Sequence, residues 1–440
     1  MKSPVALIVL LIVISSAAYA ETPAKSLVDQ QADSLMKSHK VFIPHTDIAN
    51  RSESYNDSVQ HTIQLFYVDQ FRHFQDPQAP YFLLMSKDTK LAMGIGGAVR
   101  MRGYFDWGGA IPASGFAPYL IPMHPDPTKM RKFDTTPAGS CLFFKVIGQN
   151  KTLGSYQLYI EANFNGYQAR DFHLKKAYAI VDDFTIGYAA STFSDPAALP
   201  PTVDAQGPNN KISNSNVLIR WMPTFREHWV LALSAETPTV QASTDNVSTK
   251  KIDNWIPDGA AFVQYQWGPT SHVRLSGIVR SLSYRDMINS KNHYRVGWGL
   301  LLSSVAHPHP ALTTYTSINY GKGYAGLGGD LLIGNYDLVN DPARPGYLYA
   351  PASFGWCLGV QYNILPNLFV SASFSQTRYL PSHRVAGDEY KYGLMGDINI
   401  FWNLTPRIEV GAEFDWGRRK EFSGEACSAR RIGAVAQFSF

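Results

Sequence analysis

Apolar and polar residues alternate with a period of two through most of the chain after Leu91. The last ten residues are the clearest case: every even position from Ile432 to Phe440 is apolar, and the odd positions are polar or small except Val435. This period predicts β-strands that have one apolar and one polar face. We predict about sixteen of them, starting near Leu91, Ser140, Gly154, Asp171, Phe184, Ile212, Trp229, Asp258, His272, His293, Ala311, Ser353, Leu368, Glu389, Arg407 and Ser428.

The apolar faces of these strands carry aromatic residues near one end. In a soluble β-sandwich the apolar face points into the core, and aromatic residues rarely mark its ends. Aromatic residues at both lipid interfaces are instead typical of transmembrane barrels, whose strands need only about 9–11 residues to cross a membrane. The pattern therefore favours an all-β fold, a closed antiparallel transmembrane β-barrel; the aromatic residues are Trp107, Trp229, Trp267, Trp402, Trp416 and Tyr362.

Successive connections between strands lie alternately at the two ends of the barrel, and their lengths differ between those ends. If the last strand ends in the periplasm, the connections on that side are short: 149–151, 181–183, 223–228, 268–271, 365–367 and 403–406. The connections on the other side include every long one: 108–139, 194–211, 238–257, 321–352, 379–388 and 418–427. Short periplasmic turns and long extracellular loops are the rule in outer-membrane barrels, so both barrel termini are expected in the periplasm.

The start of the chain predicts export and a separate extension. Residues 1–20 combine Lys2, an apolar run and a small-residue ending at Ala20, which is the pattern of a signal peptide cleaved after Ala20. Residues 21–90 form a polar extension with a weak helical pattern, and 91–440 form the barrel. A flexible periplasmic segment, an oligomerising helix and a lumen plug remain alternatives for the extension. The terminal Phe440 resembles the ending by which the barrel assembly machinery recognises its clients.

Composition and charge exclude other classes of function. The net charge of +4 in 440 residues is too small to indicate nucleic-acid binding. Cys141, Cys357 and Cys427 show no C-x-x-C spacing, so we predict no metal site and no cofactor, and at most one disulfide could form. The 13% aromatic and 17% charged composition fits an outer-membrane barrel.

Charged residues on the polar strand faces are the candidate pore-lining groups. A charge at mid-depth on the lipid face costs about 2–4 kcal/mol, whereas in a water-filled lumen it costs little and sets ion selectivity. The basic candidates are Arg100, Arg102, Lys175, Arg220, Arg274 and Arg280.

The loop at residues 191–208 is rich in Pro and carries Phe193, Leu199 and Val203. An exposed loop does not ordinarily need such residues, so we expect this third extracellular loop to fold into the lumen. Asp195 and Asp204 would then face basic residues across the narrowest section. A loop lying over the mouth of the barrel is the alternative.

The same loop carries a family resemblance. The string STFSDPAALPPTVDAQGP resembles the DcaP-like porins, as do LKKAY at 174–178, IRW at 219–221, GKG at 321–323 and GDL at 329–331. The resemblance implies a homotrimeric barrel with an inward loop and a basic constriction that favours small anionic solutes such as dicarboxylates. Residues 21–61 depart from the family because they lack the sustained heptads of its coiled coil. Lys176 stands where an outward neutral residue is expected, which leaves the register of that strand open.

These observations predict a porin of the outer membrane of a Gram-negative bacterium, in contact with outer-membrane lipid and lipopolysaccharide and passing small polar, preferentially anionic solutes. An outer-membrane enzyme, a phospholipase or a protease, is an alternative, but His173, His272 and His293 have no recognisable Ser or Asp context, and we predict no catalytic residues. A structural or adhesive barrel is a further alternative. Bulky residues would usually close its lumen, whereas the inward positions here are largely small, polar or charged.

Overall fold

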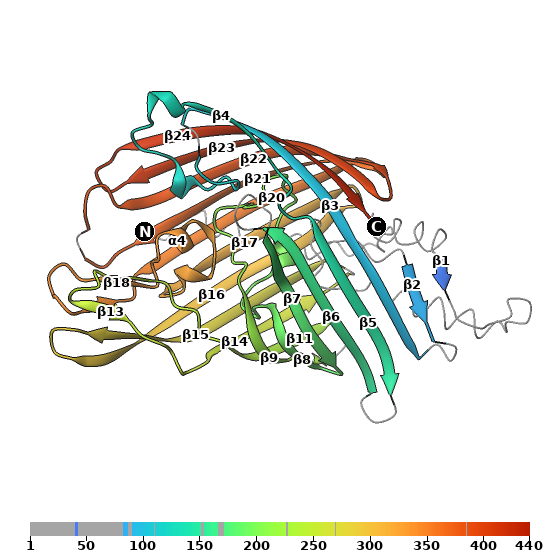
Figure 1. Cartoon of the computed structure of the whole chain (residues 1–440), viewed down its shortest axis with the longest axis horizontal. Helices are drawn as coiled ribbons and strands as arrows, with labels where there is room; N and C mark the ends of the chain where they lie inside the picture. Colours follow the sequence, from blue (N-terminus) through green and yellow to red (C-terminus); the bar gives the residue numbers. More distant parts are fainter. Residues whose placement is uncertain are drawn as a thin grey trace, which may run out of the picture.

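The computed structural model describes residues 40–42, 82–86, 90–109, 111–150, 154–165, 171–225, 228–268, 270–383 and 385–440. It is a closed antiparallel barrel of sixteen strands (Figure 1), as the alternation predicted. Three positions in the ring are each occupied by two segments. The strands are β3 (Leu91–Trp107), β4 (Arg131–Thr136) with β5 (Cys141–Asn150), β6 (Gly154–Asn165), β7 (Asp171–Val181), β8 (Phe184–Ala190), β9 (Ser215–Trp221) with β10 (Thr224–Phe225), β11 (Trp229–Glu236), β13 (Thr249–Lys251) with β14 (Asp258–Gln266), β15 (His272–Asp286), β16 (Lys291–His309), β17 (Leu312–Lys322), β20 (Ala352–Leu365), β21 (Leu368–Leu380), β22 (Tyr390–Thr405), β23 (Ile408–Glu421) and β24 (Ala426–Ser439).

The last strand closes the ring against the first. β24 pairs antiparallel with β3 over ten residues, from Arg430 opposite Trp107 to Ser439 opposite Ala98. The main chain of Phe440 then exchanges two hydrogen bonds with Gly97. Beyond this point β2 (Phe82–Met85) continues the sheet along β3, and β1 (Lys40–Phe42) pairs parallel with β2. The predicted signal peptide and most of the predicted extension lie outside the described residues.

Most predicted strand starts agree with the structure within two residues. The exception is Ile212, because β9 begins only at Ser215 and Ile212 still lies in the preceding loop, bridged to Gly328. The predicted first connection, 108–139, also contains β4, which pairs with the extracellular half of β3. Every long connection falls at one end of the barrel, as predicted, but this end also carries the short connections 287–290 and 422–425, so the predicted loop 418–427 is shorter than expected.

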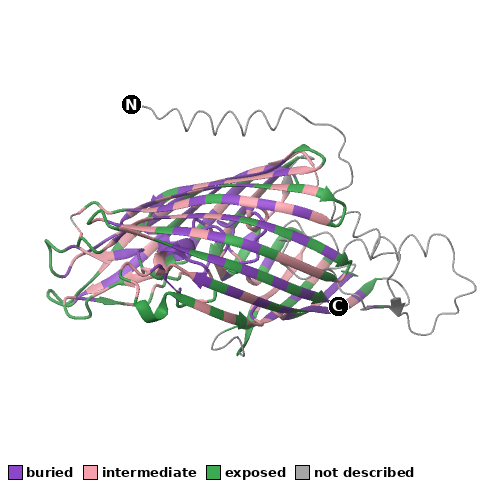
Figure 2. Cartoon of the chain, turned by 90° about the horizontal axis from the view of Figure 1, so that it is seen from above, coloured by how far each residue is buried: buried purple, intermediate pink, exposed green. Residues whose placement is uncertain are grey.

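Exposed residues are apolar and buried residues are polar through much of the barrel wall. On β3, Ile95 and Val99 are 56% and 60% exposed, whereas Arg100 and Arg102 are 8% and 7% exposed. Figure 2 shows the resulting bands of exposed and buried residues along each strand. The closed ring pairs the backbone of neighbouring strands, so the outer face needs no water. An apolar outer face with no edge is suited to lipid, and it leaves the polar face for the lumen.

A β-bulge resolves the register around Lys176. Between β6 and β7 the pairing shifts, so that Glu161 lies opposite Lys176 and Ala162 opposite Leu174, with Lys175 as the extra residue. Nζ of Lys175 and Nζ of Lys176 lie 2.8 and 3.8 Å from carboxylate oxygens of the buried Glu161. A β-bulge changes the face of the sheet on which the neighbouring side chains lie. It therefore places both lysines on the lumen side, and Lys176 does not break the alternation.

Short elements occupy the connections. They are the 3-10 turns η2 (Pro118–Leu120), η3 (Pro127–Lys129), η5 (Pro196–Ala198) and η6 (Ala325–Leu327), the helix α4 (Gly329–Ile333), and a small sheet of β12 (Ala242–Ser243), β18 (Leu338–Asn340) and β19 (Leu348–Tyr349). Within the described ranges, no helix has the length and apolar character needed to span a membrane.

Candidate pore constriction

Three loops of the extracellular end pack against the inner wall of the barrel. We call them L1 (residues 111–130), L3 (191–214) and L6 (323–351). L3 was predicted to fold inward, and the structure agrees, because most of its residues from 191 to 212 are buried. L1 and L6 were not predicted to do so. They show the same kind of sequence feature as L3, apolar residues within a loop, and the buried ones include Ile111, Phe116, Ile121, Leu327 and Leu331.

Asp195 anchors the start of L3 to the wall. Its carboxylate lies 2.9 Å from Nε2 of His272, accepts a 2.6 Å hydrogen bond from Ser303 and stands 3.5 Å from Nη1 of Arg274. Asp195 thus lies between the serine and the histidine, and the two do not form the Ser–His relay of a hydrolase. The cluster holds a loop in place. Asp195 and Arg274, both predicted to line the pore, pair with each other instead.

The tip of L3 is held by one carboxylate of β23. Glu413 accepts hydrogen bonds of 2.6 Å from the backbone N–H groups of both Val203 and Asp204. Val203 packs with Phe369, Phe401 and Val435 of the wall. Charge-assisted bonds to two consecutive N–H groups fix the position of the loop backbone. The tip of L3 therefore lies against β21–β24.

Arg431 connects L1, L3 and the wall at this tip. Its Nε lies 2.6 Å from Asp106, and its Nη1 lies 3.0 Å from Asp204. The same guanidinium donates to the carbonyls of Ala113 and Ser114 in L1 and stacks 4.1 Å from the ring centroid of Tyr104. Asp204 was predicted to face Arg100, Arg102 or Arg220. In the structure it forms an ion pair with Arg431, and its field also reaches Arg102.

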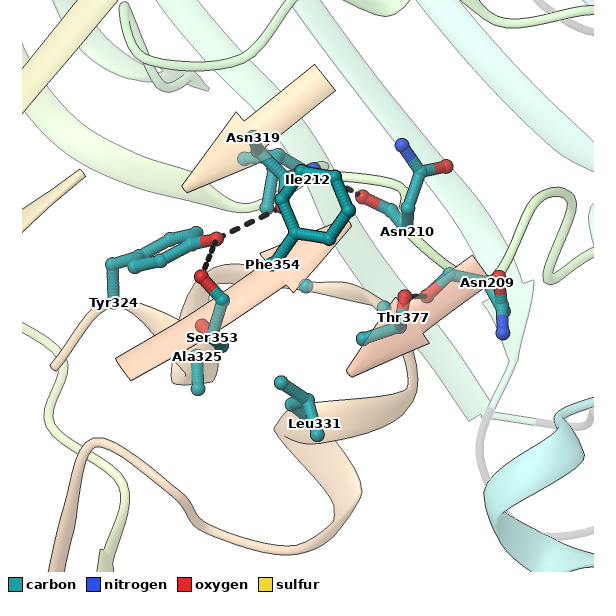
Figure 3. Close-up of a pocket in the computed structure, with 12 residues that line it drawn as sticks. Asn209, Asn210, Ile212, Asn319, Tyr324, Ala325, Leu331, Ser353, Phe354 and Thr377 are labelled. Atoms are coloured by element: carbon teal, nitrogen blue, oxygen red, sulfur yellow. Dashed lines mark hydrogen bonds between the residues drawn. The ribbon is translucent and has the colours of Figure 1, made fainter. Parts of the chain in front are cut away.

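L6 packs against the returning half of L3. Asn209 donates to Asp330 of α4, which also accepts a 2.8 Å hydrogen bond from the hydroxyl of Tyr390. Figure 3 shows the small pocket at this junction, with Asn210 and Ile212 of L3 on one side and Tyr324, Ala325 and Leu331 of L6 on the other. The hydroxyl of Tyr324 donates to Asn319 of the wall and to the backbone carbonyl of Ser353, while Asn319 donates to the carbonyl of Asn210.

Arg280 links L6 to the barrel wall. It is fully buried and forms 3.0 Å ion pairs with Asp258 of β14 and Asp337 of L6. Asp337 in turn accepts from the backbone N–H groups of Gly326 and Gln241. Arg280 was predicted to line the pore together with Arg274. Both lie in buried ion pairs behind loops, so their charges are neutralised by adjacent carboxylates.

The arc from β3 to β9 carries the remaining predicted basic residues. Arg100 and Arg102 project inward from neighbouring positions of β3, and both guanidinium groups approach Gly139. Arg220 projects inward from β9, opposite Thr185 of β8. Lys145 of β5 also points inward, and sequence reasoning did not select it, although its place in the alternation would have revealed it. The L3 hydrogen bonds described above go to β11–β24. Arg102 nevertheless lies within the field of Asp204 and Glu413, Arg100 donates to Gln437 of β24, and Arg220 donates to the carbonyl of Ala190, just before L3 begins.

The carboxyl group of Asp330 should make the stability of the folded protein depend on pH. Burial raises the pKa of Asp330 to about 7, because desolvation outweighs its hydrogen bonds from Tyr390 and Asn209. Between pH 4 and 7 the folded protein therefore keeps a proton that the unfolded chain releases, so stability falls as pH rises and levels off above pH 7. We expect Asp330→Asn to flatten this fall by up to ~1.4 kcal/mol per pH unit. The midpoints of urea unfolding in detergent at several pH values measure this slope of stability against pH.

Glu425→Gln in the exposed last loop is the control for that measurement. Glu425 lies at the surface, 3.8 Å from His124, with 60% of its side chain exposed. Neutralising an exposed group should leave the wild-type pH profile unchanged. Equal pH slopes for wild type and Asp330→Asn would show that the buried carboxyl does not control stability.

A closed sixteen-stranded barrel with long loops folded into a polar lumen defines the fold of an outer-membrane porin. No family profile matches the chain, and neither does any curated protein sequence. Among solved structures it is similar to the outer membrane channel DcaP of Acinetobacter baumannii, with a TM-score of 0.68 and 17% identity over 81% of this chain and 99% of that chain. The predicted resemblance to DcaP-like porins is thus confirmed at the level of the fold.

Two further structures share the fold more distantly. The anion-selective porin from Comamonas acidovorans has a TM-score of 0.52 and 10% identity over 80% of this chain and 100% of that chain. Outer-membrane expressed OmpT of Vibrio cholerae has a TM-score of 0.52 and 9% identity over 80% of this chain and 98% of that chain. All three neighbours are outer-membrane proteins or porins.

Proposed function

We propose that this protein is a porin of the Gram-negative outer membrane that lets small polar solutes diffuse through its lumen, with preference for anions such as dicarboxylates. The observation that carries the proposal is the uneven distribution of charge around the lumen. Arg100, Arg102, Lys145 and Arg220 lie on the arc from β3 to β9, whereas the carboxylates of β22 and β23 lie beside the tip of L3. These inward carboxylates are Asp397, Glu413 and Asp415, whereas Glu409 of β23 lies on the same row of the sheet as Arg100 and within its field.

The hydrogen bonds of L3 determine which arc can interact with a passing solute. L3 covers Glu413 with its backbone and pairs Asp204 with Arg431, so these charges already have partners in the protein. The two lysines near Glu161 share a single carboxylate. Basic groups therefore dominate the arc from β3 to β9, and a lumen lined by one sign of charge concentrates counter-ions of the other sign.

A carboxylate solute would meet this arc as a transient ligand. Guanidinium groups at i and i+2 on one strand, as in Arg100 and Arg102, offer paired donors that match the planar carboxylate. The opposing acidic side creates a field across the lumen, which orients dipolar solutes. One porin with a similar fold, from Comamonas acidovorans, is anion-selective, which is consistent with the proposal.

The assembly proposed with this function is a homotrimer. Support comes from the sixteen-stranded fold and from the trimer form of OmpT of Vibrio cholerae, whose structure has a TM-score of 0.50 against this chain. The proposed location, after removal of residues 1–20 and assembly through the terminal Phe440, is the outer membrane. Chemical crosslinking in intact membranes, followed by native mass measurement, tests this stoichiometry.

Planar-bilayer recording of the wild-type protein tests the proposed function. Under a tenfold KCl gradient, the reversal potential should have the sign expected for chloride being more permeant than potassium. Adding succinate to one side should produce a succinate current or a partial block of the chloride current. A cation-selective reversal potential, or no conductance from folded protein, would contradict the proposal.

A further inference from the structure

Basic side chains lie on the outer face of β21–β24 at the extracellular end. They alternate with the inward residues of the same strands, so they point away from the lumen. Arg378, Arg418, Lys420 and Arg430 are these residues, and Tyr392 lies between the first and the third in the sheet. We call this set the basic belt. None of these cations takes part in an ion pair among the described residues, and Nε of Arg378 has no hydrogen-bond partner there.

The belt is continuous across neighbouring strands. Tyr392 pairs with Arg378 on one side and with Lys420 on the other. The guanidinium of Arg378 and the ammonium of Lys420 lie 5.5 and 6.0 Å from the centroid of the Tyr392 ring. Two cations on one aromatic ring form a compact positive surface, which cation–π attraction holds together. Arg418, opposite Leu394, and Arg430, opposite Trp416, extend the belt diagonally towards the periplasmic side and are both exposed.

Aromatic residues lie on the outer face level with Arg430 and below the other three cations of the belt. Trp416 is in register with Arg430 and stacks with Phe374, at 6.4 Å between ring centroids. Trp107 on β3 contacts Phe414 at 6.1 Å. Such outward aromatic residues mark the boundary between the hydrocarbon of a membrane and its headgroups. The cations just beyond them are therefore at the depth of lipid headgroups.

The charge of this outer face differs between its two ends. Over β21–β24, no outward position is acidic, and the outward positions near the periplasmic end are apolar, including Trp402, Leu404, Ile408 and Phe438. A general need for solubility would not place cations at one end only. The asymmetry indicates an anionic partner in the extracellular leaflet.

We propose that the basic belt binds the phosphate groups of a diphosphorylated glycolipid of the lipid A type in the outer leaflet. The proposal rests on the outer-membrane location proposed above. Arg and Lys side chains suit phosphate oxygens, Arg through paired N–H donors. The acyl chains of the same lipid would lie along the exposed apolar residues below the belt, which include Phe374, Ile398 and Phe414. One lipid class thus accounts for the charge and for the apolar surface beneath it.

Titration of purified diphosphoryl lipid A into the detergent-solubilised full-length protein, read by native mass spectrometry, tests this assignment. The triple variant Arg378→Gln, Arg418→Gln, Lys420→Gln should bind lipid A at least about tenfold more weakly than wild type, since it removes three cations that would attract the phosphates. Monophosphoryl lipid A and phosphatidylglycerol should bind wild type more weakly than diphosphoryl lipid A.

The matched control removes three exposed lysines elsewhere at the extracellular end. Lys250 and Lys251 of β13 and Lys291 of β16 are all exposed and lie on strands outside the belt. Their triple Gln variant should bind lipid A like wild type. The double variant Arg378→Lys, Lys420→Arg keeps the charge and should retain binding, which separates loss of charge from misfolding.

Two results would overturn the assignment. One is equal lipid A affinity for the belt variant and wild type. The other is a belt variant that loses its oligomeric state in the absence of lipid, which would make the belt an interface between copies of this chain. These outcomes are separate from the porin proposal, because the belt faces away from the lumen. A protein that binds lipid A but does not conduct contradicts only the proposed transport.

Discussion

Replacing Arg100, Arg102 and Arg220 together with Ala should lower the chloride-to-potassium permeability ratio at least about fivefold. The three residues project into the lumen from β3 and β9. A unit charge contributes about 1 kcal/mol at 4 Å even in bulk water, and 1.4 kcal/mol is a tenfold change in an equilibrium. The carboxylates of β22 and β23 remain in the variant, so the reversal potential should move towards the cation-selective side.

The control is the Ala variant of Lys250, Lys251 and Lys291, which removes the same formal charge from exposed positions at the rim. At 1 M salt the Debye length is about 3 Å, so exposed rim charges are screened whereas lumen charges close to the permeating ion are not. The control should keep the wild-type reversal potential, and succinate flux should fall only in the lumen variant. If both variants keep wild-type selectivity, these arginines do not line the constriction. The barrel fold does not depend on this result.

Arg431→Ala should be the most destabilising single substitution proposed for this protein. Its guanidinium forms ion pairs with Asp106 and Asp204 and donates to two carbonyls of L1, all in a buried environment. Removing it leaves two buried carboxylates without their cation. Breaking a buried ion pair in this way costs about 3–5 kcal/mol, mainly because an uncompensated charge remains. Midpoints of urea unfolding in detergent measure the loss.

The same variant should change the channel. L1 and L3 meet at Arg431, so its loss should loosen both loops and increase single-channel conductance or its fluctuations. Arg344→Ala is the matched control, because the Arg344 side chain is 65% exposed; it lies 3.7 Å from Asp341 and 5.3 Å from the ring centroid of Tyr347. An exposed pair contributes about 0–1 kcal/mol, so the control should unfold like wild type. Equal midpoints for the two variants would contradict the role assigned to Arg431.

The barrel itself followed from local sequence properties. A strand exposes every second residue to lipid, so a period of two, repeated about sixteen times, specified the strands, their faces and their even number. Loop parity then fixed which end carries the long loops. Only one predicted strand start, Ile212, differs by more than two residues, because L3 uses its last residues to bridge L6 before β9 begins.

The arrangement inside the lumen depended on contacts that the alternation does not encode. Alternation shows that Arg274, Arg280 and Arg431 point inward, but it does not identify the carboxylate each of them meets. The decisive partners lie far apart in the chain: Arg431 and Asp106 are separated by 325 residues, and Glu413 and Val203 by 210. Only ring closure brings them together.

The sequence alone therefore determined the class of fold, the two faces of each strand and the inward folding of L3. The tertiary structure decided which inward charges form ion pairs with loop residues, as Arg274, Arg280 and Arg431 do. It also decided that L1 and L6 enter the lumen, and that a bulge turns Lys175 and Lys176 towards Glu161. The physical reason is that lipid requires apolar residues at alternate positions of every strand, which the sequence shows directly. Each buried charge instead requires one particular partner, and only the folded chain shows which one.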